Sequence, residues 1–230
     1  MDTRREADVI KIITIEREYG SGAAAIGKAL AHNLGWTLWD REITCEIARR
    51  LKCDVQAVEQ REERPDPTFY RLVKVFMRGS YEESLQGGGR LELLDAEHLA
   101  LLFEKIATDI AAKGKSVIIG RGSPWFLRKR DDTLRVFVYA PVDEKIRRLK
   151  AQGKSQSEAE DLIASVDRER AAFVKKYYGA NWPERYLYHL MINSGIGDEA
   201  VIKMILSEMD LLDAKSPLVA GTGAAQHSSR

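Results

Sequence analysis

The segment from Val9 to Leu34 constrains the fold most, because three local patterns follow one another in it without a gap. A β-branched apolar run, Val9 to Ile15, leads directly into the glycine-rich stretch Tyr19-Gly20-Ser21-Gly22. Apolar residues then recur at the spacing of one helix face, at Ile26, Leu30 and Leu34. The sequence therefore predicts a buried strand, a glycine loop and a helix in direct succession.

Strands and helices alternate along most of the remaining chain. Further short strands are predicted over 36–39, 116–119, 134–139 and 186–192. Helices are predicted over 95–113, 142–152 and 157–177 and from Asp198 onward. Ser157 and Glu160 form a predicted capping box at the start of the helix over 157–177. Five short apolar strands separated by helices favour an α/β fold with one parallel sheet covered on both faces. Ligands of such sheets bind beyond the carboxyl ends of the strands, so we expect chemistry in the loops there.

The length of 230 residues fits one α/β domain, which we place at 9–213. Residues 1–8 and 214–230 are predicted to be disordered ends. The charged stretch over 41–95, with Pro65-Asp66-Pro67 and a run of glycines at 87–89, is predicted to be a helical insertion on the core.

Composition narrows the class of protein. The 36 basic and 35 acidic side chains leave a net charge of +1, which gives no support for a general nucleic-acid binder. No apolar run reaches the roughly 18 residues of a membrane span and the N-terminus lacks a signal-peptide core, so we expect a cytoplasmic protein without a membrane partner. Cys45 and Cys53 are expected to be ordinary reduced thiols.

The glycine loop is a candidate phosphate site, since inward backbone N–H groups and a helix N-terminus favour an anion; a plain tight turn is the alternative. A full P-loop, Gly-x-x-x-x-Gly-Lys-Ser/Thr, fits in two imperfect registers. With Gly22 as the second glycine, Ala23 and Ala24 replace the lysine and the hydroxyl; with Gly22 as the first, Gly27 and Lys28 match but the loop enters a helical segment. We prefer the first register, which makes Lys28 a surface lysine and leaves Arg17 as a hypothetical source of charge.

Two arginines follow other predicted strands. Arg121, between Gly120 and Gly122, could bind a phosphate bidentately or form an ion pair at the sheet end. Arg41 could bind an acceptor phosphate, and the preceding Asp40 could contact a sugar or base or cap the next helix.

Another arginine lies on an apolar helix face. Arg170 shares a sector with Leu162, Val166 and Phe173, whereas Arg168 points elsewhere. A charge in such a position is costly unless paired, so Arg170 should face a carboxylate or a phosphate. Arg147 and Arg148 either join it in a lid over phosphates or lie on a solvated face.

Six segments resemble, in order, the cytidylate kinase-like proteins of bacteria, relatives of the nucleoside monophosphate kinases in the P-loop superfamily: ITIEREYGSGAAAIGKAL, WDREI, VIIGRG, VFVYAPVDEKIRRL, DRERAAFVKKYYGANW and YLYHLMINSGIGDEAVIKMI. The resemblance implies a three-layer P-loop NTPase fold with a five-stranded parallel sheet, a helical monophosphate-binding insertion over 41–95 and a lid over 147–177. It also implies transfer of the γ-phosphoryl group of ATP to CMP or dCMP, with Mg²⁺ as cofactor.

The resemblance also assigns roles to residues. Gly20, Ser21 and Gly22, flanked by Tyr19, Ala23 and Ala24, would bind the ATP phosphates. Arg41 and Arg121, beside Asp40, would hold the acceptor. Arg147, Arg168 and Arg170 would be lid arginines that stabilise charge on the phosphoryl group in flight. Arg17 is not part of this resemblance and remains our own hypothesis for a substitute catalytic charge. No residue is assigned as a metal ligand.

The chain departs from the well-characterised cytidylate kinases at three positions. These enzymes keep the P-loop lysine and hydroxyl and an aspartate after the third-strand arginine, where this chain has Ala23, Ala24 and Gly122. Two other functions therefore stay open: a nucleotide-binding or sensing protein with weakened catalysis, and a kinase for another small acceptor. Aromatic residues could stack on a base or belong to the core: Trp36, Trp39, Phe69, Tyr70 and Phe76.

Overall fold

The computed structural model describes residues 10–40, 96–120 and 122–214. Within them, five strands form one parallel sheet in the order β2-β3-β1-β4-β5. The strands are β1 (Ile12–Arg17), β2 (Thr37–Trp39), β3 (Ser116–Ile119), β4 (Thr133–Tyr139) and β5 (Leu190–Asn193). This sheet confirms the predicted fold class.

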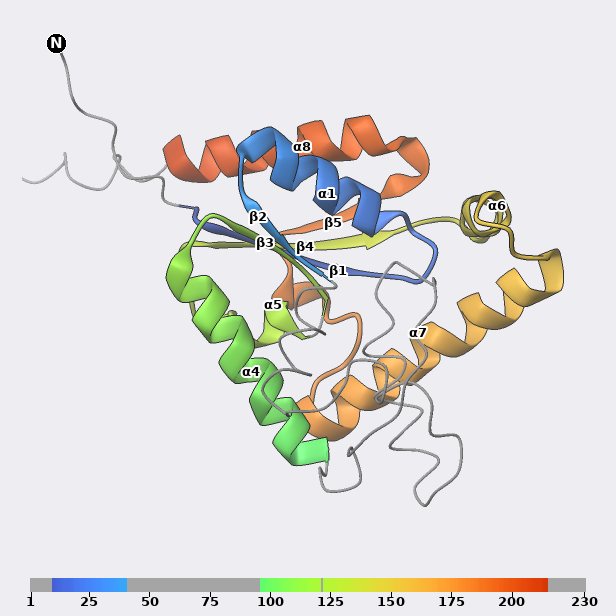
Figure 1. Cartoon of the computed structure of the whole chain (residues 1–230), viewed down its shortest axis with the longest axis horizontal. Helices are drawn as coiled ribbons and strands as arrows, with labels where there is room; N and C mark the ends of the chain where they lie inside the picture. Colours follow the sequence, from blue (N-terminus) through green and yellow to red (C-terminus); the bar gives the residue numbers. More distant parts are fainter. Residues whose placement is uncertain (1–9, 41–95, 121, 215–230) are drawn as a thin grey trace, which may run out of the picture.

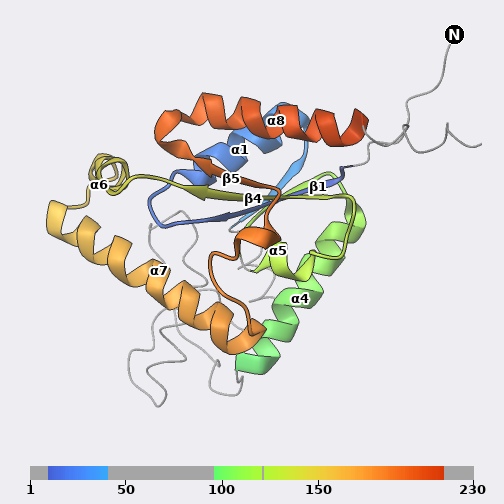
Figure 2. The ribbon, with the colours of Figure 1, turned by 180° about the vertical axis from the view of Figure 1, so that it is seen from behind.

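Helices cover both faces of the sheet, which gives three layers (Figure 1). On one face lie α1 (Ala23–Leu34) and α8 (Asp198–Ala214). On the other lie α4 (Ala96–Lys113), α5 (Ser123–Phe126) and α7 (Gln156–Tyr178), as the view from behind also shows (Figure 2). Beyond the end of β4, α6 (Val142–Ala151) precedes α7, and the short 3-10 helices η2 (Arg185–Leu187) and η3 (Ser194–Ile196) flank β5.

The central strand β1 divides the core in two. Ile13 and Ile15 pack on the α1 and α8 side, in a cluster with Leu30 and Ile205. Ile12 packs on the other side, in a cluster with Phe103 and Phe173. All six residues of β1 are buried, as expected for an inner strand of a parallel sheet with both faces covered. The carboxyl end of β1 is thereby fixed in the middle of the ligand-binding edge.

Two local predictions need correction. Helix α7 is capped by Ser155, whose side chain accepts a hydrogen bond from the N–H of Glu158, two residues before the predicted capping pair. Strand β5 is shorter than predicted, because residues 185–187 form η2 and pairing with β4 begins only at Leu190.

Some predictions lie outside the described residues: the end at 1–8, the insertion at 41–95 and the tail, apart from Ala214, which ends α8. None of the helices within the described ranges is long and apolar enough to cross a membrane.

The core cluster on the α4 and α7 side of the sheet provides a stability prediction. Phe173 of α7 is fully buried beneath the sheet, so Phe173→Ala should reduce the free energy of unfolding by about 3–5 kcal/mol. Leu101 of α4 is 63 % exposed, so Leu101→Ala should change it by less than about 0.5 kcal/mol. Urea unfolding monitored by circular dichroism measures both, and equal losses would contradict this assignment of the core.

Candidate functional site

The chain crosses from β1 to α1 through a short glycine loop, residues 18–22. Gly20 and Gly22 adopt left-handed backbone angles, with φ of 77° and 80°. Gly22 is the N-cap of α1, and no side chain caps the helix. The first N–H groups of a helix have no carbonyl partner within it, so this uncapped end can bind an anion.

The position of α1 decides between the two P-loop registers. The helix starts at Ala23 and includes Gly27 and Lys28, so the loop ends at Gly22 as in the preferred register. A Cβ at Gly27 would overlap the side chain of Ile119. Gly27 is therefore explained by close packing of α1 on β3 rather than by phosphate binding.

The loop forms one wall of a cavity of about 490 Å³. Five basic side chains line this cavity: Arg17, Lys28, Arg147, Arg148 and Arg170. Glu18 is the one carboxylate among its described lining residues. Lys28 is exposed, as predicted, yet it also borders the cavity. A basic cavity at a helix N-terminus is suited to a polyphosphate.

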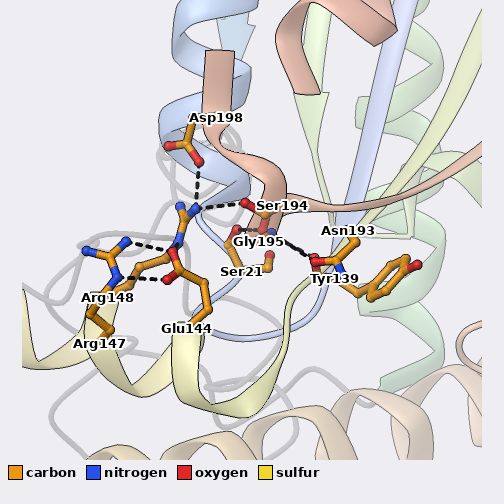
Figure 3. A network of polar contacts seen from close by, with 9 residues as sticks. All are labelled: Ser21, Tyr139, Glu144, Arg147, Arg148, Asn193, Ser194, Gly195 and Asp198. Carbon is orange, nitrogen blue, oxygen red and sulfur yellow. Dashed lines mark hydrogen bonds and ion pairs between the residues drawn. The ribbon is translucent and has the colours of Figure 1, made fainter. Parts of the chain in front are cut away.

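Two arginines of α6, Arg147 and Arg148, also line the cavity. Figure 3 shows the polar contacts that they make. Arg148 donates to Glu144 and Asp198, each at 2.7 Å, and to the carbonyl of Ser194 at 3.2 Å. A Cβ at Gly22 would overlap its guanidinium, so Arg148 lies directly against the loop. The side chain of Arg148 is only 15 % exposed, which excludes the solvated-face interpretation for this residue.

Arg147 is the more accessible member of this pair, with its side chain 68 % exposed. It donates two hydrogen bonds of 2.7 Å to the carboxylate of Glu144. Hydrogen bonding from Arg147, aided by Arg148, lowers the pKa of Glu144 to about 2. The carboxylate between the two arginines is therefore ionised across the neutral pH range.

Arg170 approaches the loop from α7, and the predicted carboxylate partner is present. Its Nη1 donates to Asp167 at 3.0 Å and to the backbone carbonyl of Arg17 at 3.1 Å. Burial lowers the pKa of Arg170 to about 10, with repulsion from Arg17 contributing. The guanidinium of Arg170 thus remains charged at neutral pH.

Arg17 is itself buried and forms a 3.4 Å ion pair with Glu16. Its guanidinium lies against Gly120, where it would overlap an added Cβ.

Two residues of the site were missed by the sequence analysis. Lys145 of α6 is buried, and its Nζ lies 2.5 Å from Glu18 and 4.0 Å from Asp167. Ser194 donates a 2.6 Å hydrogen bond to the carbonyl of Ser21. Lys145 precedes the buried Leu149 by four positions, so helical spacing could have revealed its inward direction. No local pattern marks Ser194.

The structure brings most of the predicted donor-site residues together and separates others. The cavity is lined by the following predicted residues: Arg17, Tyr19, Gly20, Ser21, Gly22, Ala23, Ala24, Arg147 and Arg170. Arg168 is exposed on α7 and does not line it. Asp40 is buried at the end of β2, away from the cavity lining.

Other predicted contacts are core residues or cannot be placed. Arg41 and Arg121 lie outside the described residues, as do Phe69, Tyr70 and Phe76. Trp36 packs against the core on the α1 side and Trp39 against the core on the α4 side. For these two tryptophans the core interpretation is confirmed.

A protein-held Mg²⁺ does not fit the residues that the structure describes. Magnesium in phosphate sites is usually held by one or two carboxylates together with substrate phosphates and water. In the described lining Glu18 is the one carboxylate, and Lys145 already forms an ion pair with it, while Ala24 stands where a P-loop has its hydroxyl. No group of three His, Cys, Asp or Glu gathers as a metal site within residues 10–40, 96–120 and 122–214.

The model of the cytidylate kinase-like family matches residues 12–196, which is most of the chain. The chain belongs to this family. Among curated proteins, none matches it significantly.

Two solved structures with TM-scores above 0.5 share the fold of this chain. An uncharacterized protein from Eubacterium ventriosum is 19 % identical, with a TM-score of 0.61 over 86 % of this chain and 98 % of its own. A gluconokinase from Sinorhizobium meliloti is 12 % identical, with a TM-score of 0.51 over 93 % and 99 %. A shikimate kinase from Acinetobacter baumannii is 15 % identical, with a TM-score of 0.49 over 92 % and 97 %. At these identities the likeness concerns the fold alone.

The contact between Gly22 and Arg148 provides the next prediction. Gly22→Ala should displace Arg148 and lower the affinity for inorganic tripolyphosphate about tenfold or more. Gly153→Ala is a matched control, because Gly153 also has a positive φ of 90° but no atom within 4 Å of the added Cβ. Both variants should lose about 1–2 kcal/mol of stability from the left-handed backbone, and only Gly22→Ala should lose affinity.

Calorimetric titration and thermal unfolding measure the two quantities. Equal tripolyphosphate affinity of the two glycine variants would contradict a phosphate site at the loop.

Proposed function

We propose that this family member transfers the γ-phosphoryl group of ATP to a nucleoside monophosphate, with CMP or dCMP as the acceptor. One observation carries the proposal: a basic cavity is lined by the uncapped N-terminus of α1 and by the arginines of α6. Membership of the cytidylate kinase-like family supports the choice of acceptor.

The arrangement suits the chemistry of phosphoryl transfer, which depends mainly on positioning and on stabilising charge. In the proposal, the N–H groups at the start of α1 bind the donor phosphates. Arg147 contacts the phosphoryl group from the α6 side, and Arg17 and Arg170 contribute positive charge from the β1 side of the cavity. Mg²⁺ enters as the partner of the ATP phosphates, and no protein ligand is assigned to it.

The acceptor is proposed to bind beyond β2 and β3, which are neighbours in the sheet. Asp40 directly follows β2, and Arg121 follows Gly120 at the end of β3. Since parallel strands end at the same edge, Arg41 and Arg121 would approach the acceptor phosphate from adjacent strand ends.

A second function is favoured by a specific observation. Ala23 and Ala24 occupy the first two positions of α1, where a P-loop has its lysine and hydroxyl. Loss of such groups weakens charge stabilisation in the transition state more than binding of the ground state. A protein that binds ATP without transferring its phosphate would result.

A turnover assay separates the two functions. Purified protein is mixed with ATP, Mg²⁺ and each of CMP, dCMP, UMP, AMP and GMP, and ADP release is compared with a control lacking acceptor. We expect release above the control with CMP or dCMP. Measurable ATP binding without any turnover would favour the sensor, and absence of ATP binding would exclude both functions.

Arg147 offers a direct test of the proposed mechanism. Because its side chain is exposed and lines the cavity, Arg147→Ala should lower kcat about 100-fold and leave the thermal unfolding midpoint nearly unchanged. Lys150→Ala removes an exposed charge from the same helix outside the cavity lining and should leave kcat unchanged. An unchanged kcat in Arg147→Ala would remove Arg147 from the mechanism.

A further inference from the structure

We infer that Lys145 is a positioning residue for the glycine loop: from α6, its buried ammonium group fixes the conformation in which the loop binds phosphate. The consequence for ATP binding rests on the function proposed above, whereas the effect on the loop itself does not. The loop carries alanine where a P-loop carries lysine, and the one buried lysine among the described residues, Lys145, comes from a different element of the fold.

Lys145 contacts the loop with both its charge and its carbon chain. Its Nζ forms a 2.5 Å ion pair with Glu18, and its side chain is only 7 % exposed. Gly20 lies against the base of the same side chain, since a Cβ at Gly20 would be 3.1 Å from the Cβ of Lys145. One residue thus contacts the loop at two positions, Glu18 and Gly20.

The charge of Lys145 also compensates a second carboxylate. Asp167 of α7 lies 4.0 Å from Nζ, and burial raises the pKa of Asp167, with Arg170 opposing that effect. Without the lysine, two carboxylates from different elements would share a poorly solvated gap and repel each other. Removing one member of such a buried ion pair leaves an uncompensated charge.

Asp167 transmits this arrangement to the loop backbone. Its Oδ1 accepts a 2.9 Å hydrogen bond from the N–H of Tyr19 and another from Arg170, which in turn donates to the carbonyl of Arg17. Lys145 lies between Glu18 and Asp167 and so joins α6 to both the loop and α7. Displacement of Lys145 should therefore weaken the contacts that hold residues 17–20 of the loop, all at the same time.

The alternative is a structural role, in which Lys145 only balances charge. Three variants separate the two roles: Lys145→Met, Lys145→Arg, and the double variant Glu18→Gln with Lys145→Met. The double variant removes one charge of each sign, so it also covers the case in which the single Met variant does not fold. Lys203→Met is the matched control, because Lys203 forms an exposed ion pair with Glu199 on α8.

Amide hydrogen exchange of the peptide covering residues 17–24, thermal unfolding and calorimetric titration with ATP are the three measurements. Lys145→Met should exchange faster in this peptide and bind ATP at least about tenfold more weakly. Lys145→Arg should restore most of the affinity. The double variant should regain thermal stability but neither loop protection nor ATP affinity, and Lys203→Met should resemble the wild type in all three measurements.

Unchanged exchange of residues 17–24 in Lys145→Met would overturn the inference, whatever the nucleotide result. Full recovery of loop protection in the double variant would also overturn it, because charge balance alone would then explain the lysine. If the wild-type protein binds no ATP, the proposed function fails, and the exchange experiment still decides the role of Lys145.

Discussion

The structure depends on how the link between β1 and α1 is held. β1 is the buried centre of the sheet, and its neighbour along the chain, α1, starts after only a short loop with two left-handed glycines. Such a loop has little intrinsic preference for one conformation, because glycine is the least restricted residue. Besides one local hydrogen bond, from the N–H of Ser21 to the carbonyl of Glu18, its conformation is set by partners distant in sequence. These are Arg170 on the carbonyl of Arg17, Asp167 on the N–H of Tyr19, and Ser194 on the carbonyl of Ser21.

The ion pairs of the site explain why the net charge of the chain gives no sign of a basic cavity. Each described arginine of the cavity has a carboxylate partner, as in the ion pairs of Arg17 with Glu16 and of Arg170 with Asp167. A net charge of +1 for the whole chain is therefore compatible with a basic cavity.

The ion pairs of the cavity arginines differ in how easily a ligand can replace the carboxylate partner. Arg147 is mostly exposed and can turn toward a phosphate at little cost, whereas Arg170 is buried and fixed by its partners, which suits it to positioning.

Sequence patterns predicted the structural features that depend on residues close together in the chain. The strand, glycine loop and helix between Val9 and Leu34, the register of the loop and the need of Arg170 for a carboxylate all follow from periodicity over a few turns. The cap of α7 was placed at Ser157 instead of Ser155 because both serines are followed three residues later by glutamate, and the pattern alone does not choose between them. The contacts of Arg148 with Asp198 and of Ser194 with Ser21 join residues far apart in the chain, so only the order of the strands reveals them.

The two alanines at the start of α1 change where the positive charge of the site originates. A P-loop lysine is attached to the phosphate-binding loop itself, so its position relative to the loop is nearly constant. Here the guanidinium against Gly22 belongs to Arg148, which is anchored by Glu144 within α6 and by Asp198 at the start of α8. Charge at the loop then depends on the placement of α6, and Lys145 on that helix contacts the loop directly. In the proposed kinase, phosphate binding and the position of α6 are consequently coupled, because any shift of α6 moves the cation and loosens the loop at once.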